Sequence, residues 1–94
     1  MRITIAARAR ADLESIHRYI AHDNPRAAAQ MARRLNEAIG SLDHFPNRAR
    51  PGPRPGTREL VTVRPYIIVY RVGPEVVEIL RIWHGAQDRS SDNP

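Results

Sequence analysis

The residues best suited to chemistry are three arginines in the second half of the chain, Arg58, Arg71 and Arg81, followed by Trp83 and His84. A guanidinium can donate two parallel hydrogen bonds to a phosphate or a carboxylate, so these arginines predict a surface that binds an anion. Arginine does not give up its proton, which leaves His84 as the nearby acid–base group near neutral pH. Trp83 could stack on a base or close the edge of the core.

A structural role for the arginines is the alternative. They could form cross-strand ion pairs with acids of the same region, namely Glu59, Glu75 and Glu78. Side chains alternate between the two faces of a strand, and this alternation predicts that Arg81 shares a face with Val77, Ile79 and Trp83. The sequence leaves both interpretations open, an anion-binding surface and a set of ion pairs.

The composition excludes several kinds of site. All 15 cationic residues are arginine, and the chain contains neither lysine nor cysteine. Disulfide bonds, thiolate nucleophiles and lysine Schiff bases are therefore excluded. The four histidines lack the spacing of a metal site, so we expect no metal and no cofactor. The formal net charge of +5 favours an acidic partner, either nucleic acid or an acidic protein surface.

The chain length and its hydropathy predict one domain without membrane contact. The 94 residues are enough for a single small core. No segment is apolar over the roughly 20 residues that a membrane-spanning helix needs. The first residues also lack the apolar core of a signal peptide, so we expect a cytoplasmic protein.

Two helices and four strands must position these residues. Residues 2–6 alternate as a strand does, and a helix of about 15 residues should follow from Ala7, with Leu13, Ile16 and Ile20 on one face. Asn24 is a good helix cap and Pro25 suits a first helical position. We therefore expect a second helix from residue 25 to about residue 42, folded back on the first as an antiparallel hairpin.

The rest of the chain predicts a loop and an antiparallel meander. Prolines and glycines indicate a loop over residues 43–56. Strands are expected at residues 57–64, 66–72 and 75–84. The middle strand is apolar on both faces, so both faces need cover, and the helical hairpin can cover only one. The fold class is α+β, with a single domain over residues 1–88 and a flexible polar tail at 89–94.

The sequence resembles the RelE/ParE superfamily of toxins from bacterial type II toxin–antitoxin systems. The order of elements matches, and so do several phrases in their order and spacing. These are Ala-Asp-Leu-Glu-Ser-Ile at 11–16, Asp-Asn-Pro at 23–25, Arg-Pro-Gly at 50–52, Gly-Thr-Arg-Glu-Leu at 56–60, Pro-Tyr-Ile-Ile-Val-Tyr-Arg-Val at 65–72 and Ile-Leu-Arg-Ile-Trp-His-Gly-Ala-Gln-Asp at 79–88.

The resemblance implies one of two activities. RelE-like members cut mRNA in the ribosomal A site without a metal, and ParE-like members inhibit DNA gyrase; an antitoxin neutralises both. Arg58 and Arg81 match arginines that the ribonucleases use on phosphate, and His84 matches an acid–base histidine. The lysines and the C-terminal tyrosine of the ribonucleases are missing here. The resemblance therefore favours a gyrase inhibitor that also serves plasmid stabilisation. The alternatives are a ribosome-dependent mRNA endonuclease using Arg58, Arg81 and His84, and a non-toxic member that binds only its antitoxin and DNA.

Two sets of contact residues follow from this interpretation. The target would be bound by Arg58, Arg71, Arg81, Trp83 and His84. The antitoxin would cover apolar residues of the helical hairpin and of the second sheet face, which are Leu13, Ile16, Ile20, Leu35, Ile67 and Val69. DNA would be contacted only through the antitoxin.

Overall fold

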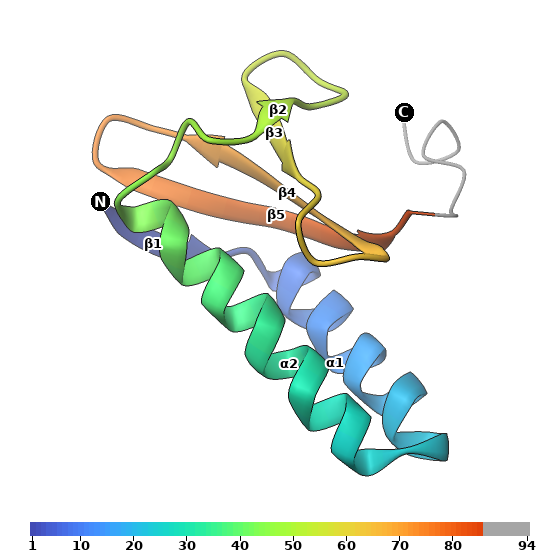
Figure 1. The fold of residues 1–94 in the computed structure, drawn as a ribbon. Coiled ribbons are helices and arrows are strands. Elements are labelled where there is room, and N and C mark those ends of the chain that lie inside the picture. The colour runs from blue at the N-terminus through green and yellow to red at the C-terminus, as the bar shows by residue number, and fades with distance from the viewer. Residues whose placement is uncertain (86–94) are drawn as a thin grey trace.

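A hairpin of two helices packs against one face of a five-stranded sheet in the computed structural model, which describes residues 1–85 (Figure 1). The elements are β1 (Arg2–Ile5), α1 (Ala7–Asp23), α2 (Pro25–Gly40), the 3-10 turn η1 (Ser41–Asp43), β2 (Arg50–Pro51), β3 (Thr57–Leu60), β4 (Tyr66–Val72) and β5 (Val76–His84). The predicted α+β class is confirmed. The domain end expected at residue 88 and the tail expected at 89–94 lie outside the described residues.

The helical hairpin forms as the sequence predicts, because Asn24 both ends α1 and begins α2. The Asn24 backbone N–H donates to the Ile20 carbonyl at 2.9 Å, and its side-chain oxygen accepts from the Ala27 N–H at 3.1 Å. Pro25 takes the first position of α2, where no N–H is needed. The second helix ends at Gly40, two residues before the expected end, and η1 continues it. Within residues 1–85, no helix has both the length and the hydrophobicity to cross a bilayer.

The sheet contains the predicted meander, the predicted first strand as β1, and one strand that was not predicted, β2. In the order β1-β5-β4-β3-β2, β1 runs parallel to β5, and every other pair is antiparallel. The expected strand at 57–64 ends at Leu60. The prediction of a loop throughout 43–56 is wrong at Arg50 and Pro51, which pair with β3. Proline is tolerated there because β2 lies at the edge of the sheet, where one side of the strand needs no backbone N–H for pairing.

A bulge in β5 changes which residues share a face. Val69 pairs with Arg81, whereas the next residue, Tyr70, pairs with Ile79, so Leu80 is an extra residue in β5. The alternation is shifted after the bulge. Ile79 therefore faces the helices, while Arg81 stands opposite Val69 on the side where Trp83 also lies. The prediction that Arg81 shares a face with Val77 and Ile79 is wrong, because strict alternation does not hold across a bulge.

Apolar residues form one cluster on each side of the sheet. The larger one joins the helices to the sheet, and its buried members include Ala9, Leu35, Ile39, Leu42, Ile68, Tyr70, Val77, Ile79 and Ile82. The smaller one lies on the outer face, which we define as the face turned away from the helices, and consists of Ile67, Val69 and Trp83 with Val61 and Leu80 packed against it. Both faces of β4 are therefore apolar, as predicted, and neither α1 nor α2 contributes to the outer cluster.

Candidate functional site

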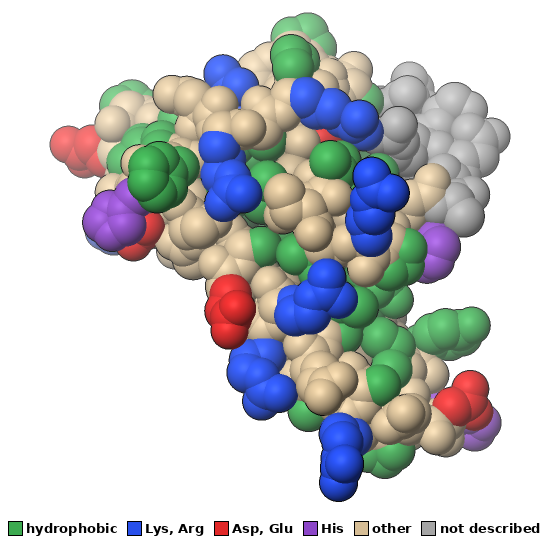
Figure 2. Space-filling model, in the orientation of Figure 1, with side chains coloured by type: hydrophobic (Ala, Val, Ile, Leu, Met, Phe, Trp, Pro, Cys, Tyr) green, Lys and Arg blue, Asp and Glu red, His purple; other side chains and the backbone are tan. Residues whose placement is uncertain are grey.

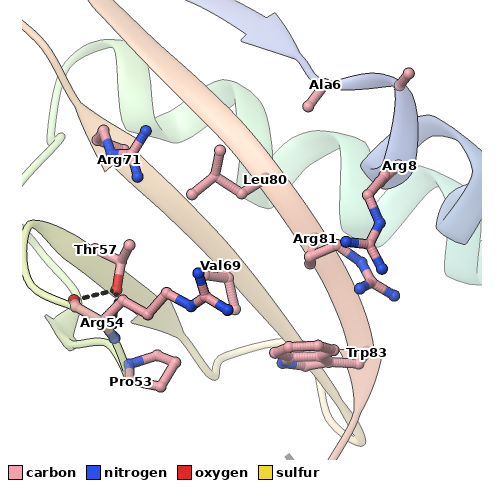
Figure 3. Close-up of a pocket in the computed structure, with 11 residues that line it drawn as sticks. Ala6, Arg8, Pro53, Arg54, Thr57, Val69, Arg71, Leu80, Arg81 and Trp83 are labelled. Atoms are coloured by element: carbon pink, nitrogen blue, oxygen red, sulfur yellow. Dashed lines mark hydrogen bonds between the residues drawn. The ribbon is translucent and has the colours of Figure 1, made fainter. Parts of the chain in front are cut away.

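A groove of about 360 Å³ crosses the outer face between β4, β5, the loop before β3 and the start of α1 (Figure 3). We call it the outer groove. Apolar atoms of Val69, Leu80 and Trp83 form part of its lining, and cations border it. These cations come from four separate segments of the chain and are Arg8, Arg54, Arg71 and Arg81. The fold thus gathers positive charge around an apolar surface.

Three cations of the outer groove are exposed, namely Arg8, Arg54 and Arg71, and the last two lie on either side of β3 in the sequence. The backbone holds Arg54 in place, since its N–H donates to the Thr57 hydroxyl at 3.2 Å and its carbonyl accepts from that hydroxyl at 2.7 Å (Figure 3). Arg71 stands opposite Glu78 in the register, yet no ion pair joins the two side chains in the described part of the chain. Glu59 instead pairs with Arg50 at 3.2 Å. Arg54 and Arg71 are therefore available to an acidic ligand.

Arg81 is held from two sides. Its Nε and Nη2 donate to the two carboxylate oxygens of Asp12, at 2.8 and 3.2 Å. Its guanidinium carbon also lies 4.8 Å from the centre of the Trp83 ring, within the range of a cation–π contact. The sequence left open an ion pair with an acid of the strands, and the acid that pairs with Arg81 in the structure comes from α1. Asp12 occupies the apolar stripe of α1 that includes Ala9, Leu13 and Ile16. An acid in such a stripe indicates that a cation or a hydrogen-bond donor of the same chain lies close to it.

Trp83 carries a buried polar atom that has no hydrogen-bond partner in the described part of the chain. The side chain is buried, at 8% exposure, and packs with Ile67 and Val69. Its indole Nε1 finds no hydrogen-bond acceptor within residues 1–85. An unsatisfied buried donor costs about 1–3 kcal/mol. Because the atom itself is buried, a partner's acceptor would reach it only after the surrounding side chains move.

The structure does not bring the predicted trio of Arg58, Arg81 and His84 together. Arg58 stands opposite Tyr70 on the helix side of the sheet, and its Nη1 donates to the Ala49 carbonyl at 2.9 Å. Arg58 therefore holds the loop before β2 in place through a hydrogen bond. His84 is exposed at the end of β5, with its ring 5.6 Å from that of Tyr66. Of the five predicted target-binding residues, Arg71, Arg81 and Trp83 line the outer groove.

Tyr70 makes stability depend on pH in alkaline solution. Burial raises its pKa above the ordinary value of 10.0, against the opposing influence of the Ala49 backbone and of Arg58. The folded protein thus holds the phenol proton more tightly than the unfolded chain does. The contribution of this pKa shift to the free energy of unfolding should therefore be fully present below about pH 10 and be lost as the pH rises above it. Thermal unfolding at pH 8 and pH 11 measures this loss, which Tyr70→Phe should reduce. An equal loss in the variant would contradict it.

The predicted antitoxin-binding residues fall into three environments. Leu13, Ile16 and Ile20 are half-buried along α1, and Figure 2 shows hydrophobic side chains between arginines on the helical hairpin. Ile67 and Val69 belong to the outer cluster beside Trp83. Leu35 is 1% exposed inside the main core, so it presents no surface to a partner in this structure. The usable apolar surface is therefore α1 together with the edge of the outer cluster.

The outer groove offers anion binding without proton transfer. Among the described residues that line it, arginine is the only ionisable type. A guanidinium stays charged at all physiological pH values and cannot act as an acid or a base. Nor do His, Asp and Glu side chains gather in groups of three or more that could hold a metal ion, anywhere in residues 1–85.

Comparison with known proteins places this arrangement in a family. Residues 3–89 match the family described as ParE toxin of type II toxin-antitoxin system, parDE. Toxin RelE2 of Caulobacter vibrioides is 46% identical over 80 residues, which cover 85% of this chain and 90% of that protein. Toxin RelE1 of the same bacterium is 33% identical over 90 residues, covering 93% and 96%.

A solved structure agrees with the sequence matches. A chain from the structure titled "Chromosomal ParDE TA system from P. aeruginosa" matches with a TM-score of 0.80 at 27% identity, over 89% of this chain and 95% of that chain. The strand, helical hairpin and meander predicted from the sequence are thus the fold of a ParDE protein. The chain belongs to the ParE toxin family and is the toxin of a type II toxin–antitoxin system.

Proposed function

We propose that this toxin inhibits growth by binding DNA gyrase through the outer groove. The observation that carries the proposal is the lining of the groove, which combines four arginines with an apolar floor, and in which arginine is the only ionisable type in the described part of the chain. Such a surface binds acidic groups but cannot move a proton, so binding is favoured over cleavage. We also infer that the toxin meets this target in the cytoplasm.

A ribosome-dependent mRNA endonuclease is the second candidate. Arg81 and His84 both line a smaller groove at the end of β5, together with Tyr19 and Tyr66. This groove combines a cation with groups that can exchange protons, which is what metal-independent RNA cleavage needs. Arg58 lies on the helix side and does not contribute to it.

One experiment separates the two candidates. Purified toxin is added to a gyrase supercoiling assay, and mRNA ends are mapped in cells after the toxin is induced. We expect inhibited supercoiling and intact mRNA. Normal supercoiling with ribosome-dependent cleavage would overturn the proposal in favour of the endonuclease. His84→Ala serves as a matched variant, since it should leave gyrase inhibition unchanged and abolish cleavage.

We also infer that the antitoxin covers the apolar side of α1. Ile20 is half-buried near the end of this helix. Burying an isoleucine contributes about 1.5–3 kcal/mol, so Ile20→Glu should weaken antitoxin binding by at least about tenfold. Calorimetric titration with the purified cognate antitoxin measures this change. Arg18→Glu, an exposed position on the same helix, is the control, and equal weakening by both variants would contradict a specific apolar contact.

A further inference from the structure

Asp12 accepts three hydrogen bonds from β5, although the two segments lie far apart in the sequence. Two come from the Arg81 guanidinium, at 2.8 and 3.2 Å, and the third comes from the Ile82 backbone N–H at 2.9 Å. The Asp12 and Arg81 side chains are 17% and 22% exposed, so water screens the pair only in part. This contact joins the first helix to the strand that borders the outer groove.

The position of Asp12 follows from where β1 ends. β1 pairs with β5 as far as Ile79, and the last bond of this edge runs from the Ala6 N–H to the Ile79 carbonyl at 2.9 Å. The chain then turns into α1, so β1 provides no acceptor for the N–H groups farther along β5. The Asp12 carboxylate provides one for Ile82. It satisfies a backbone donor at the edge of the sheet and meets the neighbouring guanidinium in the same place.

The bulge at Leu80 explains why Arg81 needs a fixed partner. The bulge turns the Arg81 side chain toward Val69 and the outer groove, where several conformations of a long side chain are possible. Two bonds from one carboxylate define the plane of the guanidinium. The Trp83 ring, 4.8 Å away, lies against the same group. Arg81 is thereby oriented before any partner binds.

We propose that Asp12 is a positioning residue, which orients Arg81 in the outer groove for target binding. This inference rests on the proposed function of the groove. A pre-oriented cation loses less conformational entropy when its ligand arrives, so it binds more tightly. The carboxylate also lowers the positive charge of the site, which acts in the opposite direction. The two roles predict opposite effects of removing the carboxylate charge, and this makes the proposal testable.

The test compares Asp12→Asn with Glu14→Gln in the gyrase supercoiling assay. Both substitutions remove one negative charge from α1, and Glu14 is exposed. We expect Asp12→Asn to raise the half-inhibitory concentration by at least about fivefold and Glu14→Gln to leave it unchanged. In an Arg81→Ala background, Asp12→Asn should cause no further loss. Unchanged or stronger inhibition by a folded Asp12→Asn variant would overturn the proposal, and so would an equal further loss in the Arg81→Ala background.

A spectroscopic readout separates positioning from activity. Trp83 is the only tryptophan of the chain, so the emission of the full-length toxin reports on this site alone. Asp12→Asn should change the emission and its quenching by iodide, whereas Glu14→Gln should not. Emission that stays the same in Asp12→Asn would overturn the proposal. If the unaltered toxin does not inhibit gyrase, the proposed function fails, and the emission still decides whether Asp12 orients Arg81.

A second variant keeps the test valid if Asp12→Asn does not fold. Arg81→Lys retains the positive charge but cannot form two bonds with one carboxylate in the same plane. It should raise the half-inhibitory concentration by a similar factor and also change the Trp83 emission. Full inhibition by Arg81→Lys would show that charge alone is sufficient and would overturn the proposal. Thermal unfolding of each variant confirms that the folded state is being compared.

Discussion

Replacing both Arg54 and Arg71 by glutamate is expected to raise the half-inhibitory concentration of the toxin against gyrase by at least about 100-fold, since each lost charged contact costs about 1.5–3 kcal/mol. Both residues are exposed and border the outer groove. Neither guanidinium makes a hydrogen bond or an ion pair in the described part of the chain, so the fold should lose little stability. The gyrase supercoiling assay measures the change.

The control for this variant makes the same change of charge elsewhere. Arg33 and Arg34 are exposed on α2, away from the groove, and their double replacement by glutamate also changes the net charge by four units. We expect the control to inhibit gyrase nearly as well as the unaltered toxin. An equal loss in both variants would show that overall charge matters rather than the groove. Full inhibition by Arg54→Glu/Arg71→Glu would show that the target binds elsewhere.

The second large effect concerns the fold. Tyr70 is 0% exposed in the main core, and its hydroxyl donates to the Pro46 carbonyl at 2.7 Å. Tyr70→Ala should reduce the free energy of unfolding by about 3–5 kcal/mol, because it leaves a cavity and removes this bond to the loop. For a domain of this size, the loss lowers the melting temperature by at least about 12 °C. Thermal unfolding followed by circular dichroism measures it.

A milder variant separates the cavity from the hydrogen bond. Tyr70→Phe keeps the ring and removes only the hydroxyl, so it should cost about 1 kcal/mol. A loss as large as that of Tyr70→Ala would mean that the bond to Pro46, rather than the packing of the ring, dominates the stability of this region. An unchanged melting temperature in Tyr70→Ala would contradict the burial on which the prediction rests.

Most elements, the helical hairpin and the antiparallel meander were predictable from local patterns, whereas contacts between distant segments were not. Helical spacing and the Asn24–Pro25 cap fix the hairpin, and alternation with turn residues fixes the meander. By contrast, Arg81 and Asp12 are 69 residues apart, and nothing local to either residue indicates that they meet. No turn residue in the sequence indicates the bulge at Leu80. Contacts of this kind depend on how the sheet and the helices assemble.

Alternation predicts the face of Arg58 but not that of Arg81. Arg58 and Leu60 lie two positions apart on one strand, so both must face the same side of the sheet. Leu60 is buried in the main core, which places Arg58 on the helix side as well. Alternation in β5 alone would put Arg81 on that same side, with Val77 and Ile79. The separation of Arg58 from Arg81 therefore depends on the bulge at Leu80 and was not predictable. The loop carbonyl that Arg58 contacts, that of Ala49, could not be inferred, because the course of a proline-rich loop depends on tertiary contacts.

The parallel pairing of β1 with β5 has a consequence for how the toxin is made. Within residues 1–85, β1 lies at the edge of the sheet and pairs only with β5, which the ribosome synthesises more than 70 residues later. Contacts between distant segments form late, since closing a long loop costs entropy before the contact stabilises it. A nascent chain that has not yet emerged beyond residue 76 thus lacks β5, and with it both the complete sheet and the outer groove. The surface that we propose binds the target is therefore completed only by the last described strand of this domain.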